Sequence, residues 1–254
     1  MRVYSIIGAT RNIGKTRIIE QLIKEFKERG IPVTVIKHTE KDLDMEGKDT
    51  YRFMKTGAEK TIALTPNGAT IFTREKSLEK VLEKYVEKRG IILVEGLKRS
   101  KYPKIVIVEV IDEIDKLKFE GKLLAIVVKN NLKKYAIRGK PIYRIDEIGK
   151  IADLIENTAL KETLKCMGGL NCGLCGYKSC KDYAKAIIHG DDWEGKCKLK
   201  YRVKLEIDGR EIQIKPYVEY VLFNIIDGYV KTLKGYTPKF KEVKVKIEDA
   251  EANT

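Results

Sequence analysis

The first apolar run and the turn after it constrain this chain more than any other stretch. Val3 to Ile7 is apolar apart from one serine, and the segment Gly8-Ala9-Thr10-Arg11-Asn12-Ile13-Gly14-Lys15-Thr16 follows it directly. Apolar residues at helical spacing begin just beyond Thr16, so the pattern predicts a strand, a tight turn and a helix. This order is typical of a phosphate-binding loop, in which backbone N–H groups and a helix N-terminus face the phosphates of a nucleotide.

The residue types in this turn suit that chemistry. Gly14 permits close approach of the backbone, Lys15 supplies a cation for the outer phosphates, and Thr16 supplies a hydroxyl ligand for magnesium. In the spacing G-x-x-x-x-G-K-T the first glycine is expected at position 9, where this chain has Ala9, a small substitute, with Gly8 one residue earlier. The alternative is a chance glycine-rich turn. The predicted nucleotide-binding residues of the loop are Ala9, Thr10, Arg11, Asn12, Ile13, Gly14, Lys15 and Thr16.

Composition bounds the class of protein. The 254 residues, 43% of them apolar, can form one large domain or two modest ones. No apolar run approaches the length of a membrane span and the N-terminus leads straight into the first strand, so we expect a cytoplasmic protein without a membrane partner. The net charge of +14 is compatible with nucleic acid, with anionic ligands or with a hot cytosol. Nucleic acid is the weakest of these interpretations because the lysines are spread along the chain, and the 35% charged content favours a thermophile.

Strand and helix patterns alternate up to about residue 157. They predict a three-layer α/β domain of the P-loop NTPase type with a mostly parallel sheet. The expected strands are residues 3–7, 31–37, 91–96, 105–110 and 123–128, with a hairpin of 60–65 and 70–73, and the expected helices are 15–29, 49–56, 78–86 and 146–157.

A second site residue follows from the strand of residues 91–96. This apolar strand ends in Glu95, and a carboxylate at the carboxyl end of a strand beside a phosphate-binding loop is expected near the magnesium ion. Asp42, Asp44 and Glu46 lie in a loop at the same end of the sheet, where they either assist the metal or form a solvated acidic loop.

Several ordered motifs make residues 1–157 resemble the molybdopterin-guanine dinucleotide biosynthesis protein B (MobB) family of P-loop GTP-binding proteins. Besides the Gly-Lys-Thr loop, they are Ile36-Lys37-His38-Thr39, then Gly47-Lys48-Asp49-Thr50-Tyr51-Arg52, and Leu93-Val94-Glu95-Gly96-Leu97-Lys98 followed by Pro103-Lys104. The resemblance implies GTP and Mg²⁺ binding, weak GTP hydrolysis and a homodimer. It also implies an accessory role, beside the molybdenum-cofactor guanylyltransferase, in attaching guanosine monophosphate to molybdopterin.

The resemblance also implies roles for individual residues. Lys15 contacts the outer phosphates, Thr16 and Glu95 serve the magnesium ion, and Lys37 and His38 line the same pocket, with Lys15 and Glu95 as the catalytic residues. The residues by themselves do not decide between GTP and ATP.

All five cysteines lie between positions 166 and 197, which in a cytosolic protein favours a metal site over disulfides. The spacing Cys172-x2-Cys175-x4-Cys180-x16-Cys197 offers four thiolates for a 4Fe-4S cluster. It resembles the motif of corrinoid iron-sulfur proteins and of an electron-transport complex subunit, where Cys-Gly-x-Cys-Gly-Tyr opens a helix. Zinc is the alternative, although zinc ribbons use two close cysteine pairs and only one is present here. Cys166 is left over, as a bystander or an alternative ligand.

The end of the chain predicts a small α+β tail. It has a hairpin of residues 203–207 and 211–214 across Asp208-Gly209, a helix over 218–230 and a strand over 243–247. We therefore expect a nucleotide-binding domain at 1–157, an iron-sulfur segment at 158–200 and a tail at 201–254 packed with it. The favoured interpretation is a GTP-binding accessory protein of molybdenum or tungsten cofactor maturation, and the alternative is a nucleotide-driven iron-sulfur electron-transfer protein.

Overall fold

The computed structural model describes residues 2–39, 46–129, 136–137, 139–197, 203–214, 216–236, 242–245 and 247. The chain divides into two compact units, Met1–Lys198 and Leu199–Thr254, which are taken in turn. Within the described residues, no helix is both long enough and apolar enough to cross a membrane.

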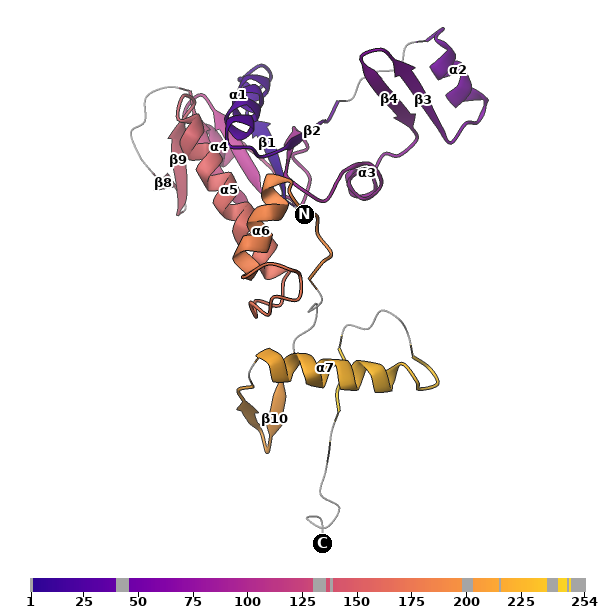
Figure 1. Ribbon diagram of the computed structural model, residues 1–254. Helices are drawn as coiled ribbons and strands as arrows, with labels where there is room; N and C mark the ends of the chain where they lie inside the picture. Colours follow the sequence, from indigo (N-terminus) through magenta and orange to yellow (C-terminus); the bar gives the residue numbers. More distant parts are fainter. Residues whose placement is uncertain are drawn as a thin grey trace. The chain divides into compact units, whose positions relative to one another are not determined.

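A seven-stranded sheet forms the centre of the first unit (Figure 1). Six strands are joined by parallel pairing, and the edge strand β8 pairs antiparallel to β9. Across the sheet the order is β2 (Val33–Lys37), β5 (Ile91–Glu95), β1 (Val3–Gly8), β6 (Lys104–Val108), β7 (Leu123–Val128), β9 (Lys140–Arg144) and β8 (Ala136–Ile137). The first strand of the chain is therefore central, with β5 and β6 as its neighbours.

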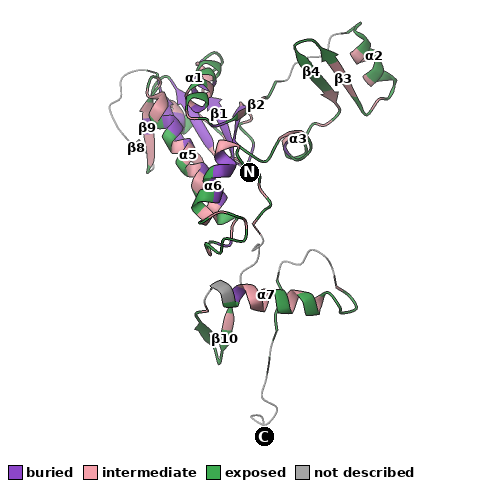
Figure 2. Ribbon diagram, in the orientation of Figure 1, coloured by how far each residue is buried: buried purple, intermediate pink, exposed green. Residues whose placement is uncertain are grey.

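Helices cover both faces of this sheet, because side chains of β1 alternate between them. Tyr4 and Ile6 pack in the cluster that includes α1 (Lys15–Glu28) and α5 (Ile148–Lys165). Val3 and Ile7 pack in the clusters on the opposite face, with Leu82 of α3 (Leu78–Tyr85) and Ile114 of α4 (Glu113–Lys116). Figure 2 shows buried residues concentrated in this sheet and in the helix faces against it. The predicted three-layer α/β fold is confirmed.

The predicted hairpin is also present. β3 (Lys60–Thr65) and β4 (Gly68–Thr73) pair antiparallel, and α2 (Asp49–Thr56) contacts both strands. The pairing opposes Ile62 to Ile71, so these side chains lie on the same face of the hairpin. Both are exposed, at 55% and 47%, and Leu64 is 82% exposed.

Two elements of the first unit differ from the sequence prediction. The helix expected over 146–157 continues to Lys165, because Ile155, Ala159 and Thr163 keep a four-residue spacing and stay buried. Helix α6 (Cys180–His189) packs against it and adds Ile188 to the same core. Strands β8 and β9 were not predicted, because Pro141 and the charged ends of β9 do not give a strand pattern.

The second unit contains the predicted hairpin and helix. They are β10 (Leu205–Ile207), β11 (Arg210–Ile212) and α7 (Pro216–Val230). The strand predicted over 243–247 is absent from the described residues of that range, where Val245 and Ile247 are 63% and 93% exposed. Alternation alone predicted this strand, and no neighbouring strand among the described residues pairs with it.

Candidate functional site

The predicted phosphate-binding loop connects β1 to α1. Gly14 is the residue before α1 and has a φ of 110°, and Asn12 has a φ of 59°, so the loop turns sharply into the helix. No side chain caps the N-terminus of α1, which leaves its first N–H groups available for an anion. The Ala9 N–H donates to the carbonyl of Ile107 at 3.1 Å and ties the loop to β6.

The loop shows why a glycine is needed at position 8 and not at position 9. A Cβ atom at Gly8 would lie 2.4 Å from Cγ2 of Ile13, a buried residue of the same loop. Ala9 is not among the residues with positive φ, so its methyl group causes no backbone strain. The departure from the expected spacing is therefore compatible with the loop geometry.

Three of the predicted site residues meet at the carboxyl ends of β2 and β5. Thr16 Oγ1 donates to Glu95 Oε2 at 3.2 Å, and Lys37 Nζ lies 3.8 Å from the same oxygen. Lys37 and Glu95 are register partners on adjacent parallel strands, and the Glu95 side chain is 15% exposed. A hydroxyl and a carboxylate oxygen at one point are the ligands that magnesium prefers.

Other predicted site residues make contacts of their own. Lys15 Nζ lies 3.5 Å from the carbonyl oxygen of Thr10, so the lysine folds back over the loop. The backbone N–H of His38 donates to the Glu95 carbonyl at 3.1 Å, and its side chain is exposed. Asp42 and Asp44 lie outside the described residues, and Glu46 accepts a hydrogen bond from Tyr51.

A buried lysine fixes the loop that follows Glu95, and sequence patterns did not predict its role. Lys104 Nζ donates to the Ser100 carbonyl at 2.7 Å, to Ser100 Oγ at 2.6 Å and to the Tyr102 carbonyl at 2.7 Å. Lys104 is fully buried, and burial lowers its pKa to about 8 although the charge of Glu120 acts in the opposite direction.

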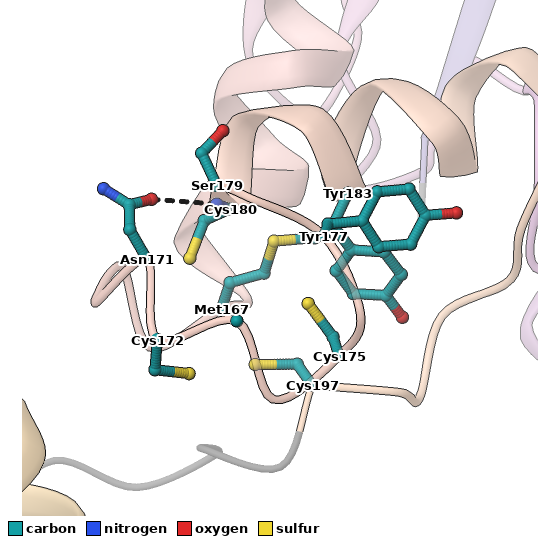
Figure 3. A pocket seen from close by; sticks show the side chains of 10 residues that line it. Met167, Asn171, Cys172, Cys175, Tyr177, Ser179, Cys180, Tyr183 and Cys197 are labelled. Carbon is teal, nitrogen blue, oxygen red and sulfur yellow. Dashed lines mark hydrogen bonds between the residues drawn. The ribbon is translucent and has the colours of Figure 1, made fainter.

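The four predicted cluster ligands line a single pocket (Figure 3). Cys180 opens α6, and the backbone between Cys172 and Cys175 turns through Gly173, whose φ is 75°. Cys197 returns to the pocket after the helix. The other lining residues are Met167, Asn171, Gly173, Tyr177, Ser179 and Tyr183, and Cys166 is not among them.

The donor set of this pocket suits a metal centre that prefers thiolate ligands. Neither in this pocket nor in any other part of the described chain are three or more His, Cys, Asp or Glu side chains already arranged to hold a metal ion. The pocket therefore suits a thiolate-bound metal centre because its four cysteines have the right ligand chemistry and line one pocket.

Hydrogen bonds around the pocket involve residues that the sequence analysis did not select. Asn171 Oδ1 accepts from the Cys180 N–H at 2.8 Å and joins the two arms of the motif. Tyr177 donates to Asp192 at 2.9 Å, and this bond raises the pKa of Tyr177 to about 12. Burial alone would raise the pKa of Asp192, but donors that include Lys196 at 2.7 Å hold it below its usual range. Asn171 stands beside Cys172 in the sequence, whereas nothing in the sequence pairs Asp192 with Tyr177.

Comparison with known proteins identifies the family. The family model "Molybdopterin guanine dinucleotide synthesis protein B" (MobB) matches residues 3–129. A relative from Methanocaldococcus jannaschii, named "Putative molybdopterin-guanine dinucleotide biosynthesis adapter protein", is 31% identical over 255 residues, which cover 98% of each chain. The chain belongs to the MobB family. A second model, "Putative Fe-S cluster", matches residues 168–199, which contain the cysteine pocket.

Further relatives cover only part of this chain. The Escherichia coli molybdopterin-guanine dinucleotide biosynthesis adapter protein is 34% identical over 108 residues, covering 39% of this chain and 62% of its own. The crystal structure of Bacillus subtilis MobB superposes with a TM-score of 0.50 at 25% identity, covering 60% of this chain and 96% of that one. The sheet and its helices therefore form a MobB fold, as the sequence motifs implied.

The lowered pKa of Lys104 predicts a pH dependence of stability. Between pH 8 and the ordinary lysine value of 10.5, the unfolded chain binds a proton that the folded protein has released, so the free energy of unfolding rises with pH. Relative to Lys104→Met, the wild type should gain up to about 3 kcal/mol across this range. Urea unfolding of both proteins at about pH 7 and about pH 10 measures the gain. Equal pH slopes for the two proteins would contradict the assignment.

Proposed function

We propose that this MobB-family protein binds GTP with Mg²⁺ at the loop of residues 9–16 and assists guanylation of the molybdenum or tungsten cofactor. The observation that carries the proposal is the meeting of Thr16 and Lys37 at Glu95, beside the uncapped N-terminus of α1. The amides of the loop face the phosphates, Thr16 and Glu95 hold the metal ion directly or through water, and Lys15 swings from Thr10 to the outer phosphates.

Weak hydrolysis of GTP is part of this proposal. The Glu95 carboxylate accepts a hydrogen bond from Thr16 and pairs with Lys37, so it would be engaged beside the metal ion and not placed to activate the attacking water. Lys15 stabilises negative charge on the transferring phosphoryl group, so both residues are catalytic in a slow reaction. The protein then works as a GTP-holding accessory to the guanylyltransferase that modifies molybdopterin, and not as a fast enzyme.

The cysteine pocket is proposed to hold a 4Fe-4S cluster. Cys172, Cys175, Cys180 and Cys197 are the ligands, and the positive φ of Gly173 and of Gly176 lets the backbone curl around the sulfurs. When bound, such a cluster supplies one-electron chemistry or a response to oxygen. Zinc remains the competing occupant, and a metal analysis separates the two.

The β3–β4 hairpin is the proposed contact between two copies of the chain. A two-stranded hairpin is marginal in water unless its apolar face is covered. The face that carries Thr61 and Phe72 is partly buried, whereas the opposite face presents Ile62, Leu64 and Ile71 to solvent. A second copy offers the same apolar face, so a two-fold contact would bury both.

Loss of the Lys15 charge should weaken nucleotide binding. Anaerobic calorimetric titration of Mg-GTP should show a loss of about 10- to 100-fold for Lys15→Ala, because a hydrogen bond to a charged group contributes about 1.5–3 kcal/mol. Lys24→Ala, at an exposed position of α1, is the matched control and should bind as the wild type does. Absent or Lys15-independent binding would refute the nucleotide site, and preference for ATP would favour the nucleotide-driven electron-transfer function.

Removal of one cluster ligand should lower the iron content. Anaerobically reconstituted Cys180→Ser should lose most of its bound iron and acid-labile sulfide, because serine is a poor ligand for a soft thiolate site. Cys166→Ser keeps the full content, since Cys166 does not line the pocket. Zinc without iron in the wild type, or equal iron in both variants, would contradict the cluster.

A charge on the exposed hairpin face should separate the dimer. Leu64→Glu is expected to give a monomer by size-exclusion chromatography with light scattering, because it places a carboxylate in the proposed contact. Val110→Glu is the control, since Val110 is similarly apolar and 51% exposed but lies outside the hairpin. A monomeric wild type, or a dimeric Leu64→Glu, would exclude this contact.

A further inference from the structure

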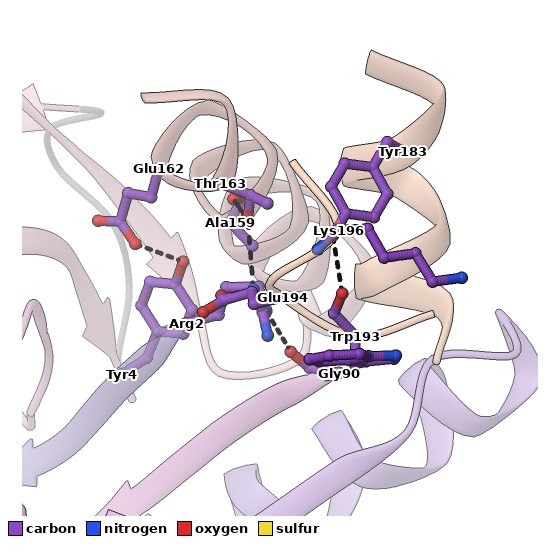
Figure 4. A network of polar contacts seen from close by, with 10 residues as sticks. All are labelled: Arg2, Tyr4, Gly90, Ala159, Glu162, Thr163, Tyr183, Trp193, Glu194 and Lys196. Atoms are coloured by element: carbon purple, nitrogen blue, oxygen red, sulfur yellow. Dashed lines mark hydrogen bonds and ion pairs between the residues drawn. The ribbon is translucent and has the colours of Figure 1, made fainter. Parts of the chain in front are cut away.

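A buried arginine connects the start of β1 to the cysteine segment (Figure 4). Arg2 is 1% exposed, and its Nε donates to the Gly90 carbonyl at 2.7 Å. Its Nη1 lies 3.5 Å from Thr163 Oγ1 of α5 and also forms an ion pair with Glu194. One side chain thus joins the loop before β5, a core helix and the segment that leads to Cys197.

The acceptors that hold Arg2 are themselves fixed. Gly90 has a φ of 65°, and a Cβ atom there would lie 2.2 Å from the carbonyl oxygen of Pro32, so only glycine fits. Thr163 is buried in α5 and donates its hydroxyl proton to the Ala159 carbonyl at 2.7 Å, which turns its oxygen toward Arg2 as an acceptor. The guanidinium therefore has a defined orientation before it meets Glu194.

Glu194 lies three residues before Cys197 and is held from two sides. Its N–H approaches the Lys88 carbonyl at 3.5 Å, and its carboxylate pairs with Arg2. On the other side, Tyr183 of α6 donates to the Trp193 carbonyl at 2.8 Å and accepts from the Lys196 N–H at 3.0 Å. The chain between Trp193 and Lys196 is thus held between Arg2 and Tyr183 of α6.

We propose that Arg2 and Glu194 are positioning residues for Cys197, the ligand that is separated from the other three by helix α6. The inference rests on the proposed cluster. Cys172, Cys175 and Cys180 are close in sequence and are organised by their own turns, whereas sixteen residues separate Cys180 from Cys197. The ion pair sets the place at which the returning chain crosses the start of β1, and so it determines the position of the Cys197 sulfur.

The chemistry of the Arg2–Glu194 pair favours a role in positioning Cys197 over a role in stabilising the fold. Replacing a buried ion pair with apolar residues of similar volume is often neutral for stability, so the pair is best explained by a fixed geometry. Arg2 Nη2 is also buried without a hydrogen-bond partner among the described residues, which adds a cost that an apolar residue would avoid. The two partners differ in exposure, because Glu194 is 29% exposed and Arg2 is 1% exposed.

Because the two side chains differ in exposure, the two single substitutions should have unequal effects. Glu194→Gln leaves an uncompensated guanidinium in the interior, whereas Arg2→Met leaves a carboxylate that can turn toward water. Glu194→Gln should therefore release iron faster than Arg2→Met does. The double variant should be milder than the sum of the two, because it carries no unpaired charge.

The experiment measures iron release from the anaerobically reconstituted full-length protein to a chelator, and alkylation of each cysteine in the metal-free protein by mass spectrometry. We expect iron release from Glu194→Gln to be about 10-fold faster, the scale of a lost outer contact at a metal site. Alkylation should rise at Cys197 and stay unchanged at Cys172 and Cys175. Trp193, the single tryptophan of the chain, reports displacement of the segment by its emission.

Two controls separate positioning from unfolding. Arg89→Met removes a 3.1 Å hydrogen bond to the Gly190 carbonyl from an exposed arginine beside the same segment, and it should release iron as the wild type does. Affinity for Mg-GTP should be unchanged in Glu194→Gln, since that site lies at the other end of β1.

Several outcomes would overturn the proposal. They are wild-type iron release and Cys197 alkylation in Glu194→Gln, or an equal rise in alkylation at all five cysteines, which indicates general unfolding. A wild type that binds no iron would refute the cluster, while alkylation of Cys197 in the metal-free variants would still decide the positioning role.

Discussion

The pairing of β1 with β5 and β6 is the constraint on which the rest of the first unit depends. These hydrogen bonds place buried and mostly apolar side chains of the chain's first strand on each side of the sheet, so helices must cover both. They also bring the end of β1 level with Glu95 and Ile107. The phosphate-binding loop therefore has a carboxylate on one side and an anchoring carbonyl on the other before any ligand arrives.

The same strand serves the cysteine segment from its opposite end. Arg2 precedes β1 and contacts Glu194, whereas Gly8 ends β1 and starts the phosphate-binding loop. Six strand residues at about 3.3 Å each place Arg2 about 20 Å from the start of the phosphate-binding loop. This separation allows each site to be altered without direct contact with the other, although both rely on one buried strand.

Sequence patterns predicted the features that depend on residues close together in the chain. The sequence could indicate the loop of residues 8–16, the carboxylate at the end of β5 and the four cysteines as candidates, because their chemistry depends on nearby residues in the sequence. The partners of Arg2 lie 88, 161 and 192 positions away, so no spacing could have revealed them. β9 was missed because Pro141 weakens its pattern, and it forms through pairing with β7. The predicted strand at 243–247 shows the converse, since alternation without a partner strand does not produce one.

Helix α5 joins the MobB sheet to the cysteine segment without a flexible linker. It runs unbroken from Ile148 to Lys165, and Cys166 follows at its end. A helix rotates by about 100° and advances by about 1.5 Å per residue, so its length sets the angular phase of whatever follows. One residue inserted near its end would turn the cysteine segment away from β1, whereas seven would nearly restore the phase.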